Sequence, residues 1–142
     1  MIGINNKSIG NLIFALLILT VIVSIIRAQK FTTDYQVTSG LVTTISSSGY
    51  QGAGNYSVHY EYAVGNKIYT GSQNYNYCSN VLRGHILDTL LIGKHFPVAY
   101  ASTDISQSTM LLTRDNAERF KYDLPDSIKS YDAILSCKLT QP

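Results

Sequence analysis

The residues that could bind a metal ion or act as a catalytic base are few and scattered. The histidines are His59, His85 and His95, and the chain has neither a His-x-x-x-His nor a Cys-x-x-Cys spacing. A zinc site needs three or four converging ligands, and two of them are commonly close in sequence. His59 alternates onto the polar face of a predicted strand beside Glu61, which is typical of a solvated pair. We therefore expect no metal site.

Nucleophilic catalysis and phosphate binding also lack their sequence signatures. The chain has no G-x-S-x-G elbow for a catalytic serine. The glycine-rich stretch 49–54 lacks the Gly-Lys-Ser/Thr ending of a phosphate-binding loop. We therefore expect a protein that is not an enzyme and that uses no cofactor and no small-molecule substrate.

The two cysteines, Cys78 and Cys137, allow two interpretations. In a domain outside the cytoplasm they could form a disulfide, and closing so long a loop would stabilise the fold by about 4 kcal/mol. They could equally be two unrelated buried thiols, because pairing cannot be deduced from the sequence alone.

Tyrosine is in excess, since 11 of the 142 residues are tyrosine and none is tryptophan. Strand propensity and packing on a sheet face account for Tyr60 and Tyr62. Tyr50, Tyr75 and Tyr77 stand among polar loop residues, and we expect them to be exposed. An exposed tyrosine combines a rigid apolar ring with a hydroxyl, which makes it a good contact residue. These three are candidate contacts for a protein or envelope-polymer partner.

Composition excludes a disordered chain and disfavours nucleic-acid binding. Hydrophobic residues make up 45% of the sequence and charged residues 14%, which is enough apolar material to build a core. The net charge of +2 comes from the first thirty residues, since eight basic residues face nine acidic ones from Phe31 onward. A nearly neutral domain is not expected to offer the basic groove that nucleic acid requires.

The first predicted element of the chain is a hydrophobic segment. Lys7 and Arg27 enclose 19 consecutive uncharged residues. As a helix this run spans about 28 Å, close to the hydrocarbon thickness of a bilayer. Thr20 and Ser24 can donate hydrogen bonds to carbonyls of the preceding turn. We predict a transmembrane helix over residues 8–27.

The same segment allows a second hypothesis, a signal peptide cleaved near Ala28 to release a secreted globular protein. Ile26 and Arg27 make this a partial match to a cleavage site. The flanking charges do not decide the orientation, because Lys7 and the α-amine nearly balance Arg27 and Lys30. The cysteine pair and the abundance of Tyr, Ser, Thr and Asn favour a domain outside the cytoplasm.

A β-hairpin is predicted between Tyr56 and Gly71. Apolar and polar residues alternate from Val58 to Val64, which is the period of a half-buried strand. The dipeptide Gly65-Asn66 tolerates the positive φ angles that primed two-residue turns require.

Three further strands are predicted. Residues 36–46 are rich in β-branched side chains around Gly40, where a bulge could form. Residues 94–100 form another strand, and Pro97, which lacks an amide donor, places it at a sheet edge or at a strand start. Residues 110–112 form a short final strand.

Two short helices are also predicted. Apolar residues recur at helical spacing over 81–91, and Gly93 is placed to end that helix. Pro125 starts a second amphipathic helix, which ends near Cys137 and could cover one face of the sheet.

Four stretches carry a family resemblance: G-L-V at 40–42, Y-E-Y-A-V-G-N-K-I-Y-T-G at 60–71, I-G-K-H-F-P-V-A-Y at 92–100 and M-L-L at 110–112. Their order resembles a family of small bacterial membrane-anchored proteins whose domain has no assigned function, and the match covers residues 40–112. The resemblance implies one or two transmembrane helices attached to a compact β domain. It brings no activity and no catalytic residue. The turn A-S-T-D-I-S at 101–106 and the tail after Arg114 depart from the family pattern.

These predictions define an α+β chain with an N-terminal transmembrane helix, a small antiparallel β-sheet or partly open barrel, and two short helices. The expected divisions are a tail at 1–7, the transmembrane helix at 8–27, a linker at 28–35, the β-rich domain with one inserted helix at 36–113 and a helical extension at 114–142. We expect a single-pass cell-membrane protein whose domain is an interaction or assembly module. The alternative is the secreted protein released near Ala28.

Overall fold

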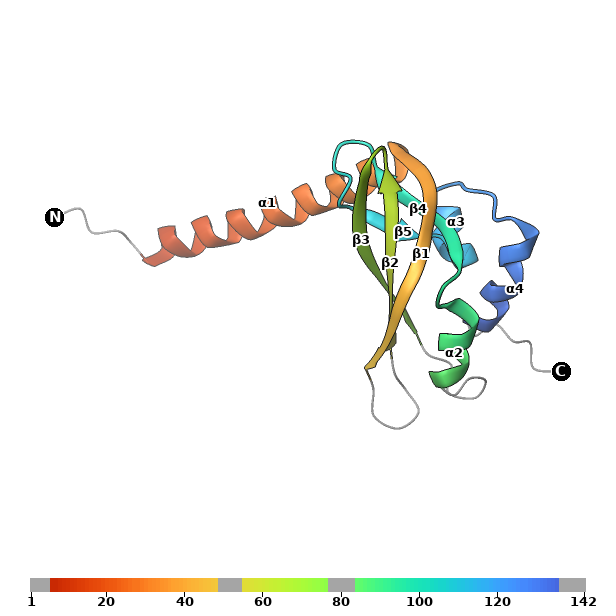
Figure 1. Cartoon of the computed structure of the whole chain (residues 1–142). Coiled ribbons are helices and arrows are strands. Elements are labelled where there is room, and N and C mark those ends of the chain that lie inside the picture. Colours follow the sequence, from red (N-terminus) through yellow and green to blue (C-terminus); the bar gives the residue numbers. More distant parts are fainter. Residues whose placement is uncertain (1–5, 49–54, 77–83, 136–142) are drawn as a thin grey trace.

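The computed structural model describes residues 6–48, 55–76 and 84–135. Its elements, in chain order, are α1 (Asn6–Thr33), β1 (Tyr35–Ser48), β2 (Asn55–Val64), β3 (Lys67–Asn76), α2 (Gly84–Leu91), β4 (His95–Ala101), β5 (Ser108–Met110), α3 (Arg114–Arg119) and α4 (Asp126–Leu135). Most of α1 extends away from a domain that contains the other elements (Figure 1).

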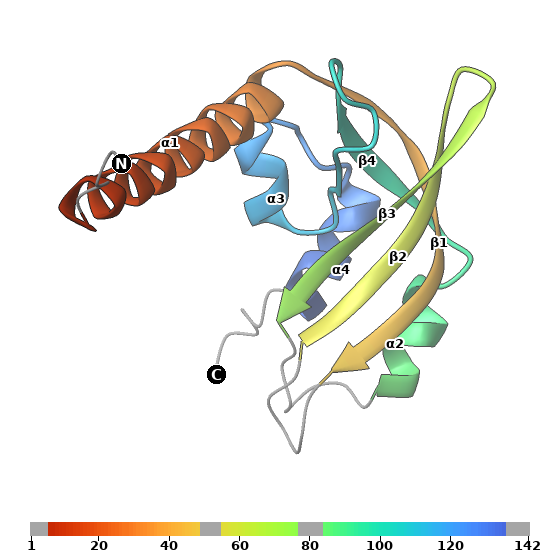
Figure 2. The same ribbon diagram turned by 90° about the vertical axis from the view of Figure 1, so that its left-hand side faces the viewer.

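The strands form one antiparallel sheet in the order β3-β2-β1-β4-β5. The sheet curls into a half-barrel, with α3 and α4 on its concave side and α2 near the far end of β1 (Figure 2). The core lies between the sheet and these helices, where Val58, Val98, Leu111 and Phe120 are at most 1% exposed. The predicted α+β fold with a partly open barrel is confirmed.

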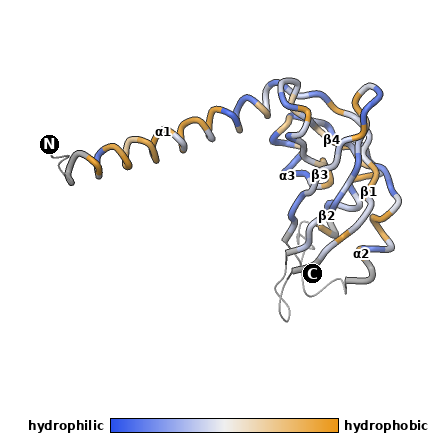
Figure 3. The backbone as a smooth tube through the Cα atoms, turned by 60° about the vertical axis from the view of Figure 1, so that its left-hand side comes forward, coloured by the Kyte–Doolittle hydropathy of each residue, from blue (hydrophilic) through white to orange (hydrophobic). Residues whose placement is uncertain are grey.

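Most of α1 consists of hydrophobic residues (Figure 3). From Ile9 to Ile26 its large apolar side chains are 39–66% exposed. Within the described chain, α1 is the one helix long and apolar enough to cross a bilayer, and a signal sequence has the same properties. Thr20 Oγ1 donates to the Leu17 carbonyl at 2.7 Å and Ser24 Oγ to the Thr20 carbonyl at 2.8 Å, as predicted.

The helix continues well beyond Arg27, and Asp34 alone separates it from β1. Residues 28–33, expected to be a linker, are therefore helical. The reason is tertiary packing. Phe31 is 7% exposed, and its ring lies edge-on to that of Phe120 with the ring centroids 4.9 Å apart. Burial of this turn against the domain stabilises the helix past the hydrophobic segment.

The predicted hairpin is confirmed. β2 and β3 pair down to Val64↔Lys67, which leaves Gly65 and Asn66 as the two-residue loop. Of these two residues only Gly65 has a positive φ, +60°. A positive φ at the first loop position alone is the pattern of a type II′ turn, whereas a type I′ turn needs it at both.

β1 is longer than predicted and bulges at a different place. The register shifts between Val42 and Thr44, while Gly40 is regularly paired with both neighbouring strands. A Cβ atom at Gly40 would lie 2.4 Å from Cγ2 of Val98. The glycine is therefore explained by the close approach of a side chain of β4 rather than by a bulge.

The sequence placed Pro97 at a sheet edge or at a strand start. The edge position is wrong, because β4 lies between β1 and β5, and Pro97 is the third residue of the strand rather than its first. The Pro97 carbonyl accepts a hydrogen bond from the Leu111 amide at 2.8 Å. In a regular hydrogen-bonded antiparallel pair, each residue donates one such bond to the other. Pro97 cannot donate the second bond to Leu111, because proline has no amide N–H. The ladder between β4 and β5 consequently ends at Met110, and the strand predicted at 110–112 is observed at 108–110.

The described chain contains three short helices where two were predicted. Gly93, with a φ of +76°, follows the end of α2, and Pro125 directly precedes α4, as expected. α3 lies within the helical extension expected at 114–142, but it was not predicted as a separate helix. Its N-cap is Thr113, whose hydroxyl accepts a hydrogen bond from the Asn116 amide at 3.4 Å, and this cap was the available sequence signal.

Candidate functional site

Most of the tyrosines between β2 and β4 line the inside of the half-barrel. The most buried, each at most 7% exposed, are Tyr56, Tyr60, Tyr62, Tyr75 and Tyr100. The rings of Tyr56 and Tyr75 stack with their centroids 5.5 Å apart. Tyr62 stacks on Tyr69 at 5.8 Å and on Tyr100 at 6.1 Å. Such pairs contribute about 0.5–1.5 kcal/mol beyond area burial. These tyrosines therefore form a core.

Hydroxyl groups of these tyrosines join the hairpin to the segment around β5. Tyr75 Oη donates to the Met110 carbonyl at 3.1 Å, and Tyr60 Oη lies 3.1 Å from Ser108 Oγ. Tyr62 Oη donates to a carbonyl of the turn before β5. Because β3 and β5 stand at opposite ends of the sheet order, these bonds hold the curled sheet closed across its concave side.

Burial also changes the acidity of these side chains. Loss of hydration raises the pKa of Tyr56, Tyr60, Tyr62 and Tyr75 above the ordinary value near 10. They are neutral at physiological pH and unsuited to act as bases. Tyr56 differs in one respect, because its buried hydroxyl has no hydrogen-bond partner within the described chain.

The expectation that Tyr75 is an exposed contact residue is wrong. β3 continues past this position, and strand alternation places Tyr75 on the concave face, where it pairs with Tyr56. The hairpin was expected to end at Gly71, which left Tyr75 in a loop, whereas β3 extends to Asn76. Tyr50 and Tyr77, the other two candidate contacts, and Cys78 and Cys137 lie outside the described residues.

The strand ends that flank segments 49–54 and 77–83 lie together at one end of the sheet. Ser48, the last residue of β1, pairs with Asn55, and Asn55 pairs with Asn76 at the end of β3. α1 joins the opposite end of β1, at Tyr35 (Figure 2). At about 3.3 Å per residue, the two ends of this strand are about 40 Å apart along the chain.

The three histidines belong to three different elements. His59 lies on β2, His95 on β4, and His85 belongs to α2. His59 Nε2 is 3.1 Å from Ser46 Oγ, and His95 Nδ1 is 3.2 Å from Ser39 Oγ. Neither pair resembles a nucleophile with its base, because within the described chain no carboxylate orients the second nitrogen of either ring. No sequence pattern singles out these serines, because strand register alone brings them to the histidines.

A polar hollow of about 520 Å³ lies beside His59, where the hairpin meets the turn before β5. Its lining residues are Thr43, His59, Tyr60, Glu61, Thr70, Gly71, Ser72, Ser106 and Ser108. Most of these carry hydroxyl groups, which suit neutral polar partners. The described chain has no hydrogen bond between His59 and Glu61 and no cluster of three or more potential metal ligands.

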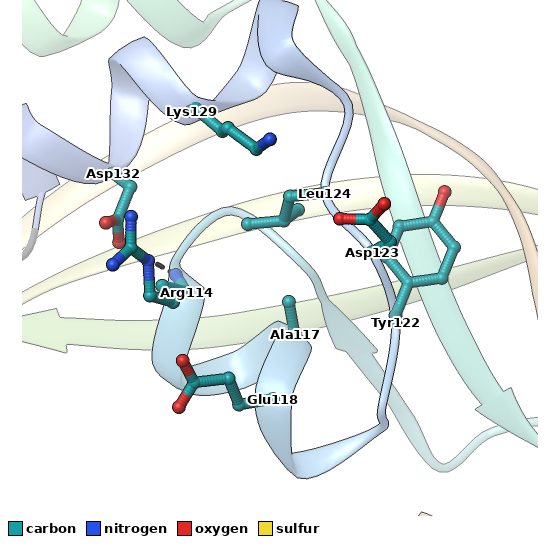
Figure 4. A pocket seen from close by; sticks show the side chains of 8 residues that line it. All are labelled: Arg114, Ala117, Glu118, Tyr122, Asp123, Leu124, Lys129 and Asp132. Carbon is teal, nitrogen blue, oxygen red and sulfur yellow. Dashed lines mark hydrogen bonds between the residues drawn. The ribbon is translucent and has the colours of Figure 1, made fainter.

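A second cleft, of about 330 Å³, lies between α3 and α4 (Figure 4). Its lining residues are Arg114, Ala117, Glu118, Tyr122, Asp123, Leu124, Lys129 and Asp132. The Asp132 carboxylate accepts a hydrogen bond from the Arg114 amide at 2.7 Å, which places negative charge at the N-terminus of α3. Lys129 pairs with Asp126 at 2.7 Å. The mixed charges of the lining favour neither a phosphate nor a metal ion. The hydrogen bond between Asp132 and the Arg114 amide connects α4 to α3.

Comparison of the chain with protein-family models, with curated proteins and with solved structures found no match. The structure itself defines a class of protein. An apolar N-terminal helix, of the kind that anchors a protein in a membrane or directs its secretion, is followed directly by an antiparallel β module.

Proposed function

We propose that the chain is a single-pass membrane protein that presents its β domain outside the cytoplasm as an interaction or assembly module. The observation that carries the proposal is the apolar, exposed surface of α1 from Ile9 to Ile26. Removing so large an apolar surface from water requires a bilayer or a partner of equal extent.

The junction supports retention of the helix over its removal. Cleavage near Ala28 would cut a continuous helix one turn before Phe31, which is packed in the domain. N-terminal sequencing of the mature protein, with alkaline carbonate extraction of membranes, tests this. An intact N-terminus in the carbonate-resistant fraction is expected. A new terminus near Gln29 in the soluble fraction would establish the secreted alternative.

For the contact surface we propose Tyr50 and Tyr77, in the two segments that follow β1 and β3 in the sequence. Their attachment points lie together and away from α1. The nearly neutral domain suits a protein or envelope polymer better than a nucleic acid. The partner binds at this surface, and the membrane helix restricts the search for the partner to two dimensions.

Photo-crosslinking in living cells tests the contact surface. A photoreactive amino acid at position 50 or 77 of the full chain should give a discrete crosslinked species. The same group at Ile68, a position on β3 that is 73% exposed and lies outside the polar hollow, serves as the control. Equal crosslinking at all three positions, or none at 50 and 77, would refute this surface while leaving the membrane anchor intact.

Thiol labelling tests the side of the membrane. A membrane-impermeant maleimide is applied to intact cells before and after reduction. Labelling of Cys78 and Cys137 only after reduction is expected for a bridged domain outside the cytoplasm. Labelling that requires cell lysis would place the domain inside.

A further inference from the structure

A cleft of about 480 Å³ lies where α1 enters the domain. One wall is the last part of α1, and the other is the turn between β4 and β5, which lies beside that end of the helix in Figure 1. Its lining residues are Arg27, Lys30, Phe31, Ala101, Thr103, Asp104 and Gln107.

The helical wall of this cleft carries two unpaired positive charges. Arg27 and Lys30 are three residues apart and therefore share a helix face. Within the described chain neither forms an ion pair, and the one salt bridge found there joins Lys129 to Asp126. Phe31, on the same side of the helix, is buried and fixes the backbone to which both basic side chains belong.

The opposite wall contributes polar groups and one acid. The Asp104 carboxylate is already hydrogen-bonded within its own turn. Its Oδ1 accepts hydrogen bonds from Ser106 Oγ at 2.6 Å and from the Ser106 amide at 3.2 Å. Thr103 and Gln107 add a hydroxyl and an amide to the lining. The acid and the negative end of the helix dipole both oppose an anion, but together they carry less charge than the two basic side chains.

The position of the cleft along α1 matches the headgroup layer of a bilayer. The apolar run ends at Ile26, so Arg27 marks the boundary of the hydrocarbon core. From Arg27 to Thr33 the helix rises about 9 Å, comparable to the thickness of the interfacial layer on one side. A lipid phosphate at this level would lie beside both basic side chains.

We propose that this cleft binds the phosphate of an anionic phospholipid headgroup, held by Arg27 and Lys30 with Thr103 and Gln107 as hydrogen-bonding partners. The inference rests on the proposed membrane anchor and adds to it a specific lipid ligand. Bound lipid would fix the orientation of the domain against the membrane surface, because one wall of the site is helix and the other is domain.

Native mass spectrometry of the full chain in detergent tests this site. The probes are phosphatidylglycerol, phosphatidylcholine and inorganic phosphate, each added in equal amount. We expect one phosphatidylglycerol retained per chain, with about a tenfold preference over phosphatidylcholine. The double variant Arg27→Gln/Lys30→Gln should abolish this preference. The matched control Lys67→Gln/Lys129→Gln removes two exposed positive charges elsewhere and should keep it.

A second variant tests the domain wall. Thr103→Val/Gln107→Ala keeps both positive charges, and we expect it to lower retention of phosphatidylglycerol several-fold. Full retention would show that a basic helix end alone attracts the lipid, which would overturn the site. Equal retention of both lipids by the unmodified chain, or retention of inorganic phosphate without lipid preference, would overturn it as well. Unfolding temperatures of all variants confirm that each is folded.

The anchor and the lipid site can fail separately. A chain that appears in the soluble fraction after carbonate extraction refutes the anchor. A chain that stays in the membrane fraction but shows no lipid preference refutes only the lipid site.

Discussion

Tyr56 and Tyr75 stack on each other inside the half-barrel, yet their hydroxyls are in different situations. The Tyr75 hydroxyl donates a hydrogen bond to the Met110 carbonyl, and the Tyr56 hydroxyl has no partner within the described chain. A buried polar group without a partner keeps its desolvation cost uncompensated. The two side chains therefore form a matched pair for measuring what a hydroxyl contributes in this core.

We predict different effects of the two phenylalanine substitutions on the free energy of unfolding. Tyr75→Phe should lower the free energy of unfolding by about 1 kcal/mol, because it removes a buried hydrogen bond. Tyr56→Phe should leave the stability unchanged or raise it. Denaturant unfolding of the full chain in detergent measures both values. A larger loss for Tyr56→Phe than for Tyr75→Phe would contradict the hydrogen-bond assignment.

Gly71 provides a second test at the scale of one residue. A Cβ atom there would lie 2.5 Å from Cε2 of Tyr60 and 2.7 Å from Oγ of Ser108. Gly71→Ala should destabilise the fold by about 1–3 kcal/mol through overpacking. Ser72→Ala, at the next and exposed strand position, is the control and should be nearly neutral. Thermal unfolding of the two variants side by side decides this, and equal midpoints would disprove the close contact.

At the scale of elements, the junction between α1 and the sheet determines how the domain is held. Phe31 from α1 and Tyr35 from β1 both make edge-on contacts with Phe120, at 4.9 and 5.1 Å between ring centroids. Tyr35 Oη also donates to the Phe120 carbonyl. Contacts with Phe120 on both sides of Asp34 therefore hold the end of the helix against the domain.

Loss of the Phe31 contact with Phe120 should free the end of the helix from the domain. Phe31→Ala is expected to lower domain stability by about 3 kcal/mol, because it removes a buried aromatic ring. Limited proteolysis should then cut the chain near Asp34 faster than in the unmodified protein. Phe14→Ala removes the same ring from a position that is 66% exposed on α1, and it should change neither result. Similar cleavage rates for the two variants would contradict the locked junction.

At the scale of the whole molecule, the tyrosine core makes stability sensitive to alkaline pH. Burial raises the pKa of Tyr56 and Tyr75 above the ordinary value near 10, so these groups stay protonated in the folded state after the unfolded chain has lost the proton. Their contribution is fully present below pH about 10 and is lost as the pH rises further.

We therefore predict a fall in the free energy of unfolding above pH about 10, by up to about 1.4 kcal/mol per pH unit for each buried tyrosine. Denaturant unfolding at a series of pH values measures the slope. The double variant Tyr56→Phe/Tyr75→Phe should flatten it, because phenylalanine has no proton to lose. An unchanged slope in the double variant would show that other groups cause the alkaline loss.

Local features of the chain were predictable because local physics decides them. The length of the apolar run is sufficient to predict a helix over 8–27, and alternation with Gly65-Asn66 is sufficient to predict the hairpin. The end of α2 before Gly93 and the start of α4 after Pro125 follow from backbone preferences of single residues. Each of these depends on residues that are close together in the sequence.

Other features depend on residues far apart in the sequence. Phe120 prolongs α1 past Ala28, and Pro97 ends the pairing of β5. The proposed lipid site also combines a feature that is readable in the sequence with one that only the fold provides. The spacing of Arg27 and Lys30 is visible in the sequence, where it served only to weigh membrane orientation. The turn that faces them lies far along the chain, between β4 and β5, and only the pairing of β1 with β4 brings it beside the end of α1.

Tyrosine shows most clearly what the sequence determined and what the fold decided. The sequence determined that the domain is rich in rings that combine apolar area with a hydroxyl. It could not determine on which side of the sheet those rings lie, because a strand that continues a few residues further turns an expected loop position into a core position. Only the curl of the sheet, with Met110 within hydrogen-bonding distance of Tyr75, placed that ring inside.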